Sequence, residues 1–179
     1  ASPLTMLALK LDKPDPAQVE AQIEQSFGLP SAFKLYEDNP LAGIVAGDSN
    51  AATVFRTQAQ LQSLLILGSN SLGDQGDRKP AALALIDELV TRIQAGESID
   101  LTNEDQLKSI IEDAGTALSA TPKELEMALD ELVFLNQEIA KVGGTGEAAR
   151  DSIAQLIPYD IADSSYLNVL ENPWVSLQR

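Results

Sequence analysis

The residues of this sequence that best fit a chemical site lie in one polar stretch, Gly68–Lys79, with the sequence GSNSLGDQGDRK. Asn70, Asp74 and Asp77 supply amide and carboxylate oxygens, the ligands that Ca²⁺ prefers, and the glycines of the stretch allow tight curvature. The spacing does not match an EF-hand, because neither Asn70 nor Asp100 as first residue puts glycine sixth and a carboxylate twelfth. We expect a shallow Ca²⁺ site at Asn70, Asp74 and Asp77; the alternative is a flexible polar loop.

Adjacent carboxylates are the second group of residues that could do chemistry. Each such pair falls at a predicted helix start or on a polar helix face, where the helix dipole or water stabilises the charge. We therefore expect these pairs to be structural, and we assign no catalytic residue and no organic cofactor. The four pairs are Glu37-Asp38, Glu104-Asp105, Glu112-Asp113 and Asp130-Glu131.

The composition excludes several other kinds of site. The 179 residues include no histidine and no cysteine, so no Ser–His–Asp or Cys–His nucleophile and no imidazole or thiolate metal site can form. The formal net charge of −15 argues against nucleic-acid binding and against anionic membranes. The longest strongly apolar stretch, Leu64–Leu67, is far too short to insert into a membrane. The chain begins without Met or a signal-peptide pattern, which indicates a mature product or a fragment of a longer protein.

The elements that must position these residues are helices. Proline, glycine and capping residues divide the chain into about eight helical segments, and no period-2 strand pattern occurs. We expect an all-α fold, a helical bundle of about seven to eight helices with short connections, over residues 1–158. Residues 159–179 are expected to form a docked C-terminal extension or a linker. The predicted helices cover about residues 3–11, 16–27, 40–47, 49–67, 80–95, 103–114, 122–142 and 146–156.

Several of these helix boundaries depend on single residues. Gly68 and Gly115 are expected to end helices, because glycine favours the position just after a helix. Thr102 is expected to cap the helix that follows it. The strongest start signal is Thr121, with proline next and Glu124 completing a capping box.

Five short segments occur in order along the chain: SPLTML at 2–7, FGLP at 27–30, the stretch 38–48, AQL at 59–61 and DLT at 100–102. Together they resemble a helical module of very large bacterial, often cyanobacterial, secreted and surface proteins. In those proteins the module is similar to a spacer among calcium-binding and adhesin-like repeats. The similarity covers residues 2 to about 157, and it departs from the module's "SPLTTL" opening at Met6.

The resemblance implies a non-catalytic role in an extracellular or cell-surface location. The expected function is a structural or interaction module of a large bacterial protein, a helical spacer or adhesion-associated domain. Its partners would be the flanking domains of a longer chain, other surface proteins or polysaccharide, and Ca²⁺ is the one cofactor considered. Two alternatives stay open: a stand-alone helical protein that binds a peptide or lipid, and a hydrolase that uses only carboxylates.

Overall fold

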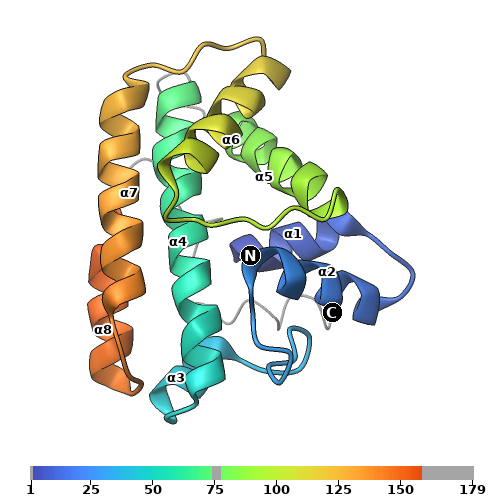
Figure 1. The fold of residues 1–179 in the computed structure, drawn as a ribbon, viewed down its shortest axis with the longest axis vertical. Coiled ribbons are helices and arrows are strands. Elements are labelled where there is room, and N and C mark those ends of the chain that lie inside the picture. The colour runs from blue at the N-terminus through green and yellow to red at the C-terminus, as the bar shows by residue number, and fades with distance from the viewer. Residues whose placement is uncertain (1, 74–77, 159–179) are drawn as a thin grey trace.

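The computed structural model describes residues 2–73 and 78–158. The predicted all-α fold is confirmed, because these residues form eight helices and no strand. Figure 1 shows α4 running through the middle of the molecule, with α7 and α8 on one side and α1, α2, α5 and α6 on the other. The helices are α1 (Pro3–Leu11), α2 (Pro16–Phe27), α3 (Pro40–Val45), α4 (Ser49–Leu72), α5 (Lys79–Gln94), α6 (Glu104–Ala117), α7 (Leu125–Lys141) and α8 (Glu147–Leu156).

The first two helices begin and end where local signals place them. The Ser2 hydroxyl accepts a hydrogen bond from the Thr5 amide at 3.2 Å, and the Asp15 carboxylate accepts one from the Ala17 amide at 3.0 Å. Each cap is followed by a proline at the start of the helix. Proline suits this position because its fixed φ is helical and the missing amide proton would have had no partner within the helix.

The central helix α4 is longer than the sequence indicates. Gly68 does not end it; the helix continues to Leu72, so the first five residues of the expected loop Gly68–Lys79 belong to α4, and its last residue, Lys79, begins α5. A Cβ at residue 68 would lie 2.8 Å from Leu85 Cδ1 and 3.5 Å from Ile111 Cγ1. A Cβ here would displace the Leu85 side chain, so glycine suits the close packing of α4 against α5 and α6 and does not end the helix.

The predicted boundaries of α6 are also wrong at both ends. Its cap is Asn103, whose side chain accepts from the Gln106 amide at 3.0 Å, while the Thr102 hydroxyl donates to Asp100. Gly115 lies inside the helix, and a Cβ there would lie 2.7 Å from the carbonyl oxygen of Ala120. Again a close approach, of α6 to the segment that follows it, explains the glycine.

The capping box at Thr121 does not start α7, which begins at Leu125. Instead, the backbone before α7 is bound to the end of α4. The Lys123 amide donates to the Ser71 carbonyl at 2.8 Å, and the Ser71 hydroxyl donates to the Lys123 carbonyl at 2.7 Å. These two bonds hold residue 123 outside the helix and override the local signal.

Helix α4 is the common wall of two apolar clusters. The larger cluster includes Val54, Leu61 and Leu65 of α4, together with residues of α1, α2, α5, α6 and α7. The smaller cluster joins Phe55 of α4 to Ile153 of α8 and to residues of α3 and α7. None of the described helices has the length and apolarity needed to cross a lipid bilayer. The expected C-terminal extension, residues 159–179, lies outside the described residues.

Candidate functional site

The three residues predicted to bind Ca²⁺ are only partly described by the structure. Asn70 lies exposed in the last turns of α4, and Asp74 and Asp77 fall outside the described residues. Within residues 2–73 and 78–158, no three Asp or Glu side chains are grouped so that they could hold a metal ion. The calcium site at Asn70, Asp74 and Asp77 therefore stays a prediction.

Asn70 contributes to a pocket between the end of α4 and the beginning of α7. The pocket has a volume of about 400 Å³. Glu124, Met127 and Glu131 line its α7 side, and Ser71 lies on its α4 side. Glu124 has a φ of 49°, a left-handed conformation that is uncommon for a residue with a side chain. The pocket thus combines acidic side chains with an exposed methionine.

The strongest structural feature near this pocket is a series of bonds that join α4 to α7. At one end Ser71 binds the backbone of Lys123, as described above. In the middle the Gln60 side chain donates to the carbonyl of Asn136 at 2.9 Å. At the other end Arg56 Nη1 donates to the Val142 carbonyl at 3.1 Å, and burial lowers the pKa of Arg56. The two antiparallel helices are therefore joined by bonds near both ends of α7 and once within it.

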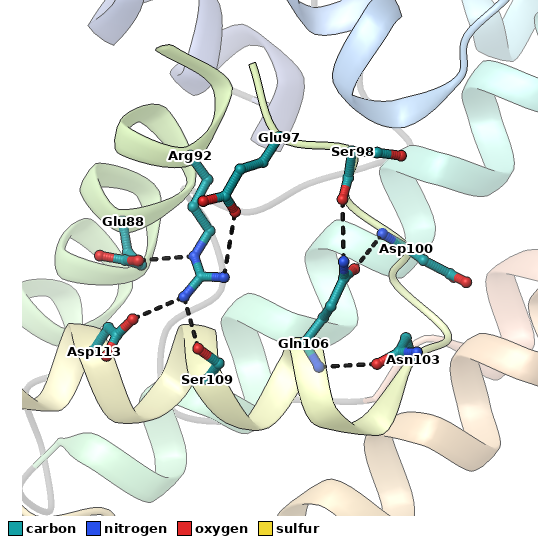
Figure 2. A network of polar contacts seen from close by, with 9 residues as sticks. All are labelled: Glu88, Arg92, Glu97, Ser98, Asp100, Asn103, Gln106, Ser109 and Asp113. Atoms are coloured by element: carbon teal, nitrogen blue, oxygen red, sulfur yellow. Dashed lines mark hydrogen bonds and ion pairs between the residues drawn. The ribbon is translucent and has the colours of Figure 1, made fainter. Parts of the chain in front are cut away.

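A second polar network joins α5 to α6 around Arg92, whose side chain is only 14% exposed. Figure 2 shows its guanidinium group among carboxylates from three segments. It lies 2.8 Å from Glu88, 2.8 Å from Asp113 and 3.6 Å from Glu97, and it donates to the Ser109 hydroxyl at 2.9 Å. One buried cation thus holds three acidic groups, so these carboxylates have a structural role.

The segment between α5 and α6 is fixed by the side chain of Gln106. Its oxygen accepts from the Asp100 amide at 2.7 Å, and its Nε2 donates to the Ser98 carbonyl at 3.1 Å, as Figure 2 shows. The backbone of this segment also binds α2, since the Ile99 amide donates to the Ser26 carbonyl at 2.7 Å. The connection is therefore ordered by specific bonds at several points.

The four carboxylate pairs lie on three parts of the fold, because two of the pairs belong to α6. Asp113 binds Arg92, and the Glu112 carboxylate lies 3.9 Å from Lys108. Asp38 accepts from the Lys34 amide at 2.7 Å. The other two pairs lie in the first turn of α6, at Glu104-Asp105, and on the exposed side of α7, at Asp130-Glu131.

Among the described residues one carboxylate, Glu24, has a clearly shifted pKa, and the sequence alone did not single it out. Glu20 and Glu24 lie one turn apart on α2, and Glu20 accepts from the Leu35 amide at 2.9 Å. Burial, followed by the charge of Glu20, raises the pKa of Glu24, and Lys34 opposes this shift. Burial and Glu20 also raise the pKa of Tyr36. The signal in the sequence was the i, i+4 spacing of two glutamates on one predicted helix.

Comparison with known proteins does not assign this chain to a family. No family model matches the chain, and neither the curated proteins nor the solved structures contain a significant match.

Proposed function

We propose that this chain is a non-catalytic structural and interaction module of a large extracellular or cell-surface bacterial protein. It would serve as a compact helical spacer that keeps flanking domains of the same chain at a fixed separation. A spacer needs helices that do not slide or separate, and needs no reacting groups. The proposal therefore depends on how the helices are held together.

The observation that carries the proposal is the bonding of α4 to α7 at three levels. Ser71, Gln60 and Arg56 bind the backbone at Lys123, Asn136 and Val142, respectively. Each bond is made to a backbone carbonyl, so it fixes the register of one helix against the other. The Gln60 bond is buried and the other two are partly buried. Such bonds resist relative motion, because a broken bond would leave a desolvated polar group without a partner.

The segments that resemble the surface-protein module also support a structural role. Ser2 caps α1, Asn39 caps α3 through the Leu41 and Ala42 amides, and Asp48 caps α4. Asp100 holds the turn before α6 by accepting from the Thr102 amide at 2.9 Å. The polar residues of these segments thus define helix starts and turns, which is what a recurring structural module requires.

The proposal is tested on the cells that produce the protein. An antibody against this chain is used for immunoblots of whole cells before and after treatment with an external protease. We expect a band far larger than the 19.1 kDa of this chain, and we expect the protease to remove it. A protease-resistant band of about the chain's own mass would overturn the proposal. A cytosolic protein probed on the same blots serves as the control for cell integrity.

A further inference from the structure

Helix α7 has one face turned to the core and an opposite face that carries large apolar side chains into solvent. Leu129, Leu132, Asn136 and Ile139 are buried against α4 and its neighbours. On the other side Met127 is 68% exposed and Phe134 is 60% exposed. These two are the most exposed large apolar side chains among the described residues. Isolated exposed apolar residues are common, so their arrangement decides what they mean.

The two side chains are seven residues apart, which places them two turns apart on the same side of the helix. Glu131 lies between them, and Glu138 follows Phe134 by four residues. We call these four residues, Met127, Glu131, Phe134 and Glu138, the outer face of α7. Its pattern alternates an apolar side chain with a carboxylate, so each apolar side chain has an acidic neighbour about one turn away.

Negative charge dominates the surroundings of the outer face. Asp130 is exposed beside it, and Glu124 is exposed just before the helix. The one lysine of α7, Lys141, lies 2.8 Å from Glu138, and Lys123 lines the neighbouring pocket, so carboxylates still outnumber lysines on this surface. A partner must therefore bring positive charge to accompany its apolar side chains.

The pocket between α4 and α7 extends this surface at its N-terminal end. Met127 and Glu131 belong to both the outer face and the pocket, and Leu67 forms apolar lining on the α4 side. A volume of about 400 Å³ accepts a large side chain. The surface thus offers the pocket beside Met127 for one apolar side chain of a partner. The exposed ring of Phe134, two turns further along α7, would contact a second one.

We propose that the outer face of α7 docks a basic amphipathic helix from a partner protein, with apolar anchors seven residues apart and Lys or Arg beside them. The inference rests on the proposed interaction role. A second copy of the chain would place acidic residues against acidic residues, which disfavours self-association. An anionic lipid surface would be repelled for the same reason.

The test uses a dye-labelled synthetic peptide of about 18 residues, or roughly five helical turns, with leucines at heptad spacing and flanking lysines. Its fluorescence anisotropy is measured against increasing concentrations of the full chain at physiological salt. A matched peptide in which glutamate replaces each lysine is the control. We expect saturable binding of the basic peptide and none of the acidic one.

Variants locate the contact on the protein. Met127→Ala with Phe134→Ala removes both exposed anchors, and we expect at least about a tenfold weaker affinity. Leu9→Ala is the matched control, because Leu9 is 57% exposed on α1, and we expect it to bind like the wild type. Glu131→Lys should weaken binding several-fold, whereas Glu37→Lys, an exposed change in the turn before α3, should have a small effect. Exposed positions are used so that every variant folds.

Three outcomes would overturn the inference. Equal binding by wild type and the Met127→Ala/Phe134→Ala variant would mean general charge attraction. Dimerisation of the wild type that this variant abolishes would make a second copy the occupant. A change in the emission of Trp174, the only tryptophan, caused by the variant without peptide would indicate the chain's own C-terminal segment. The size and surface exposure of the native protein are measured separately, so failure here leaves that proposal intact.

Discussion

Gln60 and Asn136 exchange hydrogen bonds across the interface between α4 and α7. The side-chain Nε2 of Gln60 donates to the backbone carbonyl of Asn136 at 2.9 Å, and the side-chain Nδ2 of Asn136 donates to the backbone carbonyl of Gln60 at 3.3 Å. Asn136 Nδ2 also donates to the Leu101 carbonyl at 2.8 Å. One fully buried side chain thus joins α4, α7 and the segment before α6.

Truncation of this side chain tests its importance. We expect Asn136→Ala to lower the free energy of unfolding by about 2–3 kcal/mol, because two carbonyls lose a donor and a cavity forms. Urea denaturation followed by circular dichroism measures the change. Gln137→Ala, at the exposed neighbouring position, is the control and should be nearly neutral. A loss below about 0.5 kcal/mol for Asn136→Ala, the size of an ordinary surface change, would contradict this structural role.

Gln58 and Gln60 provide a matched pair on α4. Gln58 is fully buried, and among the described residues neither of its amide atoms has a hydrogen-bond partner. We expect Gln58→Leu to raise the free energy of unfolding by about 1 kcal/mol, since the cost of burying an unpaired amide disappears. Gln60→Leu should have the opposite sign, because it removes the bond to Asn136. The same denaturation assay applies, and equal effects of the two changes would refute the distinction.

The glycine inside α6 gives a steric prediction. We expect Gly115→Ala to destabilise the fold by about 1–3 kcal/mol, because the added Cβ would clash with the Ala120 carbonyl and with Leu72. Gly143→Ala is the control, since no atom lies within 4 Å of a Cβ built there. Thermal unfolding of the two variants makes the comparison. Helix propensity alone predicts a stability gain for Gly115→Ala. Such a gain would contradict the close contact of residue 115 with Ala120 and Leu72.

Glu24 gives a prediction for pH. Burial and Glu20 raise the pKa of Glu24 above its usual 4.5, so the folded state binds its proton more tightly than the unfolded state does. The charged form is therefore destabilising, fully so above the raised pKa and not at all below the unfolded pKa. We expect Glu24→Gln to stabilise the protein at about pH 7 and to lose this advantage as the pH falls to about 4. Urea midpoints that differ equally at both pH values would contradict this assignment.

The calcium hypothesis has a direct calorimetric test. If Asn70, Asp74 and Asp77 bind Ca²⁺, titration of the wild-type chain should release or absorb heat in a saturable way. The Asp74→Ala/Asp77→Ala variant should then give none. Asp130→Ala, which removes an exposed carboxylate of α7, controls for general attraction of the cation by the acidic surface. Absence of heat from the wild type ends the hypothesis.

Helix boundaries were predictable where the signal was local. Ser2 and Asp15 bind amides two or three residues away and are followed by proline, so α1 and α2 begin where the sequence indicates. Nothing distant competes with bonds this short in sequence. The all-α class was predictable for a similar reason, since alanine and leucine favour helix and the apolar residues repeat at helical spacing.

The same reasoning failed where another segment competes. Gly68 and Gly115 resemble helix stops, yet both lie inside helices, where a Cβ would meet the Leu85 side chain and the Ala120 carbonyl, respectively. Thr121 resembles a helix start, yet Ser71 binds the backbone of Lys123, 52 residues away in sequence, and holds it outside α7. A single sequence does not contain these contacts in readable form.

The candidate sites also divide into features that residue types determine and features that packing determines. The sequence by itself determined the helical class, the acidity and the absence of imidazole and thiolate chemistry, because these follow from residue types and local spacing. The tertiary structure decided which carboxylates hold Arg92, that burial raises the pKa of Glu24, and which side of α7 remains in solvent. Each of these depends on distances between segments far apart in the chain, and packing sets those distances only when the whole core forms.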